Sequence, residues 1–181
     1  MLQGLPSSEF KRKQDYRTMG TTKNTQKQAK AELDHKLNLA KPTRQILEDL
    51  AITCAKTPSQ DNTFQYAFCL SKSCERSELR YAVQILDGLV KEGYEHQVDC
   101  MYGSACALYL LDEYDKARLR AENILRSHPE SRLARELHLS SIESSEQADK
   151  RKMKEAAIGG VTVAAAVGIA AGIASLLLTK R

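Results

Sequence analysis

The sequence predicts an all-α fold: a six-helix bundle followed by a single C-terminal transmembrane helix. Three observations predict it. Trp is absent and only three Phe occur, whereas the straight-chain residues that lose little side-chain entropy in a helix are abundant. Apolar residues recur at helical spacing from Pro42 onward, and residues 156–179 carry no charge. A chain of 181 residues fits one folded unit with appendages.

Apolar stripes and the residues that interrupt them define the six helices. The predicted helices cover Ile46 to Cys54, residues 64–73, Ser77 to Val90, residues 96–111, residues 115–128, and a segment that starts near Ser131. The fourth of these, "HQVDCMYGSACALYLL", is apolar nearly all round and is therefore predicted to be the most buried.

The chain before Pro42 is polar and basic. Residues 1–41 are predicted to be a flexible arm, since the apolar residues at its start are too sparse for a helix face. Within this arm Ala29, Leu33, Leu37 and Ala40 predict a short helix that ends before Pro42. A cleavable mitochondrial targeting peptide is the alternative, weakened by the acidic residues in the segment.

Charge is distributed unevenly along the chain. Residues 1–44 carry 10 basic and 4 acidic side chains, residues 45–148 carry 11 and 17, and residues 149–181 carry 6 and 2, which together give the net charge of +4. The predicted bundle is thus acidic. Because a nucleic-acid-binding domain carries its basic patch on the folded part, the composition argues against a nucleic-acid partner.

Two of the helix pairs resemble each other with a period of 35 residues. Ala82 and Leu86 in the first pair correspond to Ala117 and Ala121 in the second. Ala105 takes the small position of its first helix, and Pro129 closes the unit. The period is close to the 34 residues of the tetratricopeptide repeat, a helical hairpin. The sequence therefore predicts two tandem tetratricopeptide-like hairpins, packed through Ala82, Leu86, Ala105, Ala117 and Pro129, with the flanking helices as caps.

Signatures of enzymes and of cofactor sites are lacking. Neither a phosphate-binding loop, a dinucleotide fingerprint nor a zinc-protease motif occurs, and the four histidines are scattered. Five cysteines without a C-x-x-C pair are interpreted as packed thiols of a reduced domain that faces the cytosol. We expect no enzyme, cofactor or metal, although a Cys nucleophile beside a His stays open because such pairs meet only in the fold.

The uncharged run of residues 156–179 is long enough to cross a membrane once, at about 36 Å against about 30 Å of hydrocarbon. Lys150, Arg151, Lys152 and Lys154 precede it, and Lys180 and Arg181 follow it. Because so little chain follows the run, it is predicted to be a tail anchor that leaves the bundle in the cytosol, with these six basic residues as targeting residues. Gly160, Ala164, Gly168 and Gly172 form a small-residue ridge that would let two copies pair in the membrane.

The segment boundaries follow from these features. We expect a basic arm at residues 1–41, a cytosolic helical domain at 42–148, a basic juxtamembrane segment at 149–155, the tail anchor at 156–179 and a basic tail at 180–181.

Several motifs together resemble the mitochondrial fission protein family, small tail-anchored adaptors of the outer mitochondrial and peroxisomal membranes. They are "FQYAFCLSKS", "AVQILDGLV", "EYDKA", "HPESRLARELH" and the short tail with basic flanks. The resemblance covers Ile46 to Arg181. It implies a single-pass protein that recruits a dynamin-related GTPase, directly or through adaptors, to divide mitochondria and peroxisomes.

The resemblance also implies a partner groove on the concave face of the bundle. On this sequence its lining would fall on Ala67, Ser71, Tyr102, Cys106 and Tyr109. In the family an N-terminal arm can lie across that groove and regulate access.

Two other classes of adaptor remain as alternatives. A chaperone-docking or import receptor would need Lys and Asn on the inner helix faces, where this chain offers small and apolar side chains. A tail-anchored regulator of apoptosis would need a Trp-containing motif, and the chain has no Trp.

Overall fold

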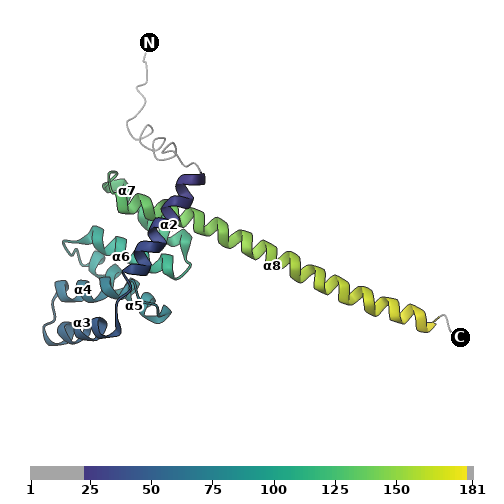
Figure 1. Ribbon diagram of the computed structural model, residues 1–181. Helices are drawn as coiled ribbons and strands as arrows, with labels where there is room; N and C mark the ends of the chain where they lie inside the picture. The colour runs from purple at the N-terminus through teal and green to yellow at the C-terminus, as the bar shows by residue number, and fades with distance from the viewer. Residues whose placement is uncertain (1–22, 179–181) are drawn as a thin grey trace, which may run out of the picture. The chain divides into compact units, whose positions relative to one another are not determined.

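The computed structural model describes the backbone of residues 23–178 and the side chains of residues 23–157 (Figure 1). Its described part is helical, with no strand between residues 23 and 178. The helices are α2 (Lys23–Leu39), α3 (Arg44–Lys56), α4 (Gln60–Leu70), α5 (Arg76–Lys91), α6 (Gln97–Leu110), α7 (Tyr114–Ser127) and α8 (Arg132–Leu178). The all-α prediction is confirmed, but the helix count is corrected from six to seven over the described residues.

The additional helix is α2, which occupies much of the predicted arm. It is longer than the short helix expected there, and it buries Gln26, Ala29, Leu33 and Leu37 along one face. Its apolar positions recur every fourth residue, which places them on a single stripe. Residues 23–39 therefore belong to the folded unit, although their composition is that of a solvated segment.

Local side chains and backbone conformations fix the helix ends. Thr43 accepts a hydrogen bond from the Ile46 amide at 3.3 Å, and Ser59 accepts one from the Asn62 amide at 3.1 Å, as N-cap residues do. α5 and α6 end in left-handed residues, Gly93 at φ 76° and Asp112 at φ 65°. The next amides, of Tyr94 and Glu113, bond back to carbonyls of the last helical turn, which closes each helix sharply.

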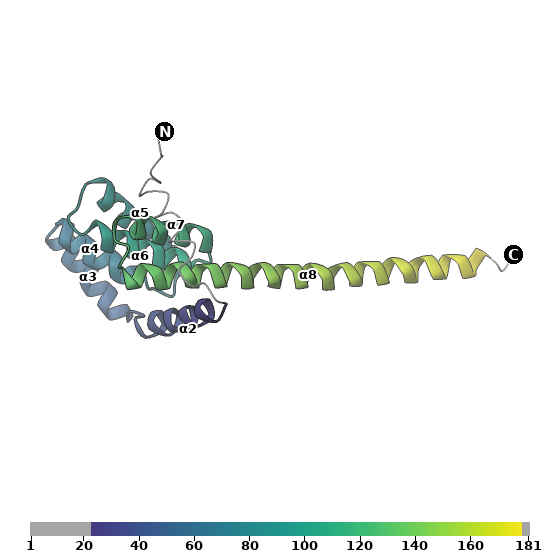
Figure 2. The ribbon, with the colours of Figure 1, turned by 90° about the horizontal axis from the view of Figure 1, so that it is seen from above.

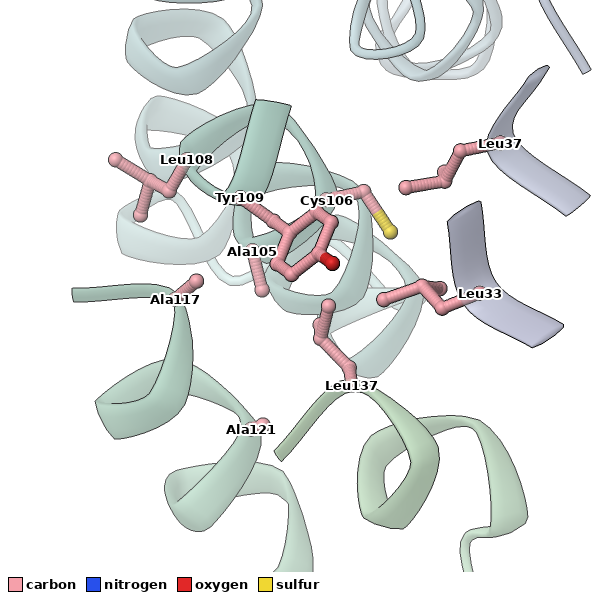
Figure 3. Close-up of a cluster of buried hydrophobic side chains, with 9 residues drawn as sticks. All are labelled: Leu33, Leu37, Ala105, Cys106, Leu108, Tyr109, Ala117, Ala121 and Leu137. Carbon is pink, nitrogen blue, oxygen red and sulfur yellow. The ribbon is translucent and has the colours of Figure 1, made fainter. Parts of the chain in front are cut away.

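The predicted repeat residues pack the two hairpins, α4 with α5 and α6 with α7. Ala82, Leu86, Ala105 and Ala117 are all fully buried. Pro129 is exposed and follows the end of α7, so that it stops the helix without packing in the core. α6 is the most enclosed of these four helices, with every residue from Gly103 to Tyr109 buried, as the sequence predicts. Figure 3 shows α6 surrounded by side chains from α2, α7 and α8.

One close approach between helices depends on glycine. A Cβ added to Gly103 would lie 2.8 Å from Cδ2 of Phe68 and 3.0 Å from Cδ1 of Leu86. Both distances are shorter than an ordinary van der Waals contact. Gly103 therefore lets α6 approach α4 and α5 more closely than any residue with a side chain would.

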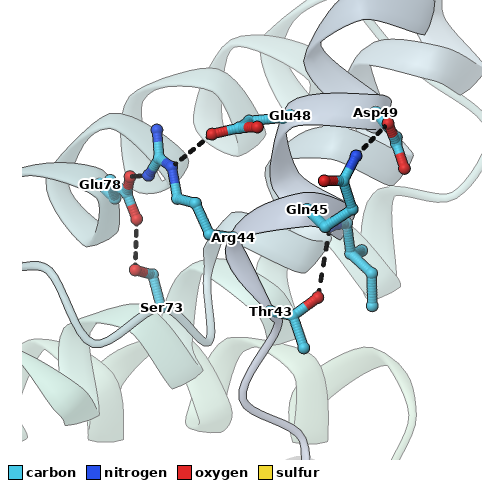
Figure 4. Close-up of polar contacts among 8 residues, drawn as sticks. Thr43, Arg44, Gln45, Glu48, Asp49, Ser73 and Glu78 are labelled. Atoms are coloured by element: carbon cyan, nitrogen blue, oxygen red, sulfur yellow. Dashed lines mark hydrogen bonds and ion pairs between the residues drawn. The ribbon is translucent and has the colours of Figure 1, made fainter.

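Polar contacts between helices recur with the period of the repeat. Arg44 pairs with Glu78 at 2.5 Å across 34 residues, and Glu78 also accepts a hydrogen bond from Ser73 (Figure 4). Across 33 residues Arg120 contacts both carboxylate oxygens of Asp87 at 2.5 and 2.6 Å. Helices that lie about one repeat apart in the sequence, α3 with α5 and α5 with α7, are thus in direct contact, as in a stacked repeat.

The chain divides into two compact units, Met1–Ser144 and Ser145–Arg181. The first unit holds the helices up to α7 and the start of α8, and Figure 2 shows α2 beside that start. Of residues 134–144 of α8, eight are buried and three are half-buried. In the second unit Lys150, Arg151, Lys152 and Lys154 are exposed.

Among the residues that the structure describes, no helix is long and apolar enough to cross a membrane. Most of the predicted span falls beyond residue 157, where no side chain is described. Gly160, Ala164, Gly168, Gly172, Lys180 and Arg181 accordingly lie outside the described side chains, and their predicted roles stay predictions.

Candidate interaction surface

A helix covers the face of the bundle where the predicted groove lies. Leu33 and Leu37 of α2 pack against Cys106 and Tyr109 of α6 and against Leu137 of α8 (Figure 3). Leu33 is 1% exposed and Leu37 5%. We refer to the surface of α6 and α8 that α2 covers as the inner face. Full burial of the two leucines contributes about 3–6 kcal/mol by area, an upper bound because the unfolded chain already buries part of them.

A hydrogen-bonded tyrosine lies at the middle of the inner face. The Tyr109 hydroxyl donates to a carboxylate oxygen of Asp34 on α2 at 2.7 Å and lies 2.9 Å from the Ser144 hydroxyl on α8. Burial, together with the nearby Asp34 carboxylate, raises the pKa of Tyr109 above its usual range. Tyr109 thus stays a neutral donor that joins three helices.

Two ion pairs join α2 to α8. The Lys36 ammonium contacts both carboxylate oxygens of Glu136, at 2.7 and 2.6 Å, and Lys23 pairs with Glu143. The two carboxylates are 7% and 2% exposed, whereas the lysine side chains are 47% and 39% exposed. The inner face therefore carries buried negative charge that the covering helix neutralises from its edges.

The structure brings together three of the five predicted groove residues. Tyr102, Cys106 and Tyr109 lie on α6, where Tyr102 is hydrogen-bonded to Cys106 and is half-buried. Ala67 is fully buried in another cluster, where it packs against residues of α5 and α6 such as Leu86 and Cys100. Ser71, also fully buried, donates to the Phe68 carbonyl of its own helix at 2.7 Å. Contact of these five residues with a partner remains a prediction.

Lys72 is a site residue that the sequence reasoning missed. Its ammonium donates to the Phe68 carbonyl at 2.9 Å and lies 3.5 Å from the centre of the Phe68 ring. Desolvation lowers the pKa of Lys72, and the neighbouring Cys106 and Cys69 thiols act in the opposite direction. The spacing Phe68-x3-Lys72 is close to one helical turn and could have indicated this contact, although α4 ends at Leu70.

The charged residues of the inner face were also missed. Glu136 and Glu143 lie in a stretch of α8 that looks polar in the sequence, but both are buried in the structure, where each pairs with a lysine of α2. A pattern of opposite charges, with lysines in the segment 23–36 and glutamates in 136–143, was the available signal.

The buried thiols are poor nucleophiles. Burial raises the pKa of both Cys100 and Cys106 to about 11, so that each is protonated at neutral pH. Within the described part of the chain, no group of three or more His, Cys, Asp or Glu side chains could hold a metal ion. What this site offers is a surface for a helix, with apolar contacts, one hydroxyl donor and two carboxylates.

Comparison with known proteins relates the chain to one family. The human mitochondrial fission 1 protein is 30% identical over 123 residues, which are 67% of this chain and 74% of that protein. The Debaryomyces hansenii mitochondrial fission 1 protein is 26% identical over 144 residues, 80% of this chain and 90% of that protein. No family model matches the chain.

Two solved structures share the fold. The crystal structure of fission protein Fis1 from Saccharomyces cerevisiae aligns with a TM-score of 0.58 at 21% identity, over 65% of this chain and 95% of that chain. Yeast Fis1 in complex with an Mdv1 fragment, which contains the N-terminal extension and coiled-coil domains of Mdv1, aligns with a TM-score of 0.54 at 23% identity, over 64% of this chain and 94% of that chain.

Proposed function

Because the chain belongs to the mitochondrial fission 1 protein family, we propose that it is a membrane-anchored adaptor for mitochondrial division. The adaptor binds a protein partner, either a dynamin-related GTPase or an intermediate that carries one, and holds it at the outer mitochondrial membrane. By the same resemblance it serves peroxisomes as well. The proposed role needs no reaction at the protein itself.

The observation that carries the proposal is the inner face and its occupant. A helix already lies on this surface through Leu33, Leu37 and Tyr109, which supports a surface shaped to receive a helix. The solved complex of yeast Fis1 with an Mdv1 fragment supports a protein partner for a chain of this fold. In the proposed function a helix of the partner takes the place of α2.

α2 then controls access to the surface. It contacts the bundle through two leucines, one hydroxyl and two ion pairs, and the ion pairs involve lysines that are more than a third exposed. Many residues of α2 are exposed and its contact with the bundle rests on these few side chains, so α2 is expected to separate from the bundle more easily than a core helix.

The anchor of the proposed adaptor is the uncharged run of residues 156–179. The exposed Lys150, Arg151, Lys152 and Lys154 would lie at the membrane surface and favour anionic lipids. The small residues Gly168 and Gly172 would allow two spans to pair, which makes a homo-oligomer part of the proposal.

Truncation tests the proposal. Removal of residues 156–181 is expected to release the protein to the cytosol and to leave cells with elongated mitochondria. The control replaces 156–181 with the tail of an unrelated mitochondrial tail-anchored protein, which is expected to restore both location and organelle shape. A truncated protein that still locates to mitochondria, or one that still supports division from the cytosol, would contradict the adaptor role.

A further inference from the structure

Glu136 and Glu143 occupy one face of α8 and are buried. They are seven residues apart, about two helical turns, so both side chains leave the helix in the same direction. Glu136 is 7% exposed and Glu143 2%. A buried carboxylate is tolerated when a cation or hydrogen-bond donors compensate its lost hydration.

α2 supplies a lysine to each of the two carboxylates. Lys36 lies one residue before Leu37 and contacts both oxygens of Glu136, while Lys23, thirteen residues earlier, pairs with Glu143. The apolar contacts of α2, through Leu33 and Leu37, lie on the same helix. α2 thus shows which pattern of residues this surface accepts: leucines four apart, a cation beside the second leucine, and another cation near the N-terminal end.

We propose that Glu136 and Glu143 select the partner of the inner face by charge. The helix that replaces α2 is a basic amphipathic helix of a partner protein, with Leu-x3-Leu spacing and a Lys or Arg at each of the two positions that Lys36 and Lys23 occupy. This inference rests on the proposed function, since it names the chemistry of the partner that the adaptor would bind.

Charge complementarity argues for this occupant against a neutral or acidic helix. Displacement of α2 removes Lys36 from Glu136 and Lys23 from Glu143, so an occupant without cations would cover both carboxylates without replacing these contacts. The cost of an uncompensated buried charge exceeds the gain from an exposed ion pair. The two glutamates therefore discriminate mainly by rejecting helices that lack cations.

The first test uses the full chain in detergent micelles and measures amide hydrogen exchange in α2. Lys36→Glu is expected to raise the exchange rate of the Leu33 and Leu37 amides at least tenfold. The matched control is Lys27→Glu, which makes the same charge change at an exposed position of α2 and is expected to change those rates less than twofold.

Reversing the charge of Glu136 distinguishes loss of the ion pair from an effect of the Lys36 substitution on α2 itself. Combining Lys36→Glu with Glu136→Lys is expected to return the exchange rates to within threefold of the original chain. If Glu136→Lys prevents folding, a double-mutant cycle with Lys36→Gln and Glu136→Gln replaces the charge reversal. The effects of the two changes on the amide exchange rates must then differ from independence by at least fivefold. Equal exchange for Lys36→Glu and Lys27→Glu, or a cycle without coupling, overturns the proposal.

The second test measures binding of a separate helix. A fluorescent peptide of residues 23–39 is added to the full chain with Leu33→Ser and Leu37→Ser, which free the inner face. Changing Lys36 to Glu in the peptide is expected to weaken binding at least tenfold, and changing Lys27 to Glu less than twofold. If the peptide binds equally well with either change, charge selection is refuted, but the adaptor role is not affected. If the tail truncation does not alter organelle shape, the adaptor role alone is refuted.

Discussion

Replacing Gly103 with alanine tests whether the close approach of α6 to α4 and α5 is a requirement of the fold. The new methyl group would lie 2.8 and 3.2 Å from two ring carbons of Phe68 and 3.0 Å from a methyl of Leu86. An ordinary contact begins at 3.4 Å, so the ring must retreat by about half an ångström or the helices must separate. We expect a net loss of stability.

The magnitude follows from two opposing effects. Alanine gains about 1 kcal/mol over glycine in a helix interior. Overpacking of a closed site costs about 1–3 kcal/mol. The crowding here involves two neighbours at once, which places the cost in the upper part of that range. The expected result is a destabilisation of about 1–2 kcal/mol.

Gly88 provides the matched control, because it is also helical and a Cβ added there meets no atom within 4 Å. Gly88→Ala is expected to stabilise the chain by about 0.5–1 kcal/mol. Urea unfolding of both variants can be followed by the near-ultraviolet circular dichroism of the tyrosines, since the chain has no Trp. Equal stabilities for Gly88→Ala and Gly103→Ala would refute the packing argument.

Three further changes are expected to alter stability. Ser59→Ala removes the N-cap of α4 and is expected to cost about 1 kcal/mol in urea unfolding, with Ser59→Asp close to the original. Asp87 and Arg120 are each about a quarter to a third exposed and share two short contacts. A double-mutant cycle with alanine at both positions is therefore expected to give a coupling energy of about 1 kcal/mol in urea unfolding, and a coupling energy of zero would contradict this prediction. Hydrogen bonds from Ser73 and Arg44 hold the pKa of Glu78 below its usual value. The stability that this contact contributes is therefore present at neutral pH and is lost as the pH falls through the lowered pKa. Glu78→Gln is expected to weaken the acid dependence of the melting temperature between about pH 5 and 3.

The repeat was predictable because its signal is strong and local. Ala82 and Ala117 lie at equivalent positions of two hairpins, and a small residue is required where two helices approach closely. The enclosed helix 96–111 was predictable for the same reason, since an apolar surface all round has no side to face water. The structure agrees with both.

The inner face was only partly predictable. A stripe of Ala29, Leu33 and Leu37 predicts a helix, but it does not say which surface the helix will cover, because that depends on contacts with residues 70 to 100 positions away. The family resemblance placed Ala67 in the groove, yet Ala67 packs in a cluster with residues of α5 and α6. Glu136 and Glu143 look like solvated residues in the sequence, but both are buried and paired with lysines of α2.

The contacts between helices one repeat apart limit how far a local disturbance travels along the stack. Arg44 contacts Glu78, and Asp87 contacts Arg120, but each bond joins only adjacent units. Stability in such a stack is the sum of the units and of the interfaces between neighbours. Damage at α3 is therefore expected to unfold that end of the stack first and to leave α6 and α7 folded. The surface that α2 covers belongs to the opposite end, so binding there can survive the loss of the end that borders α3.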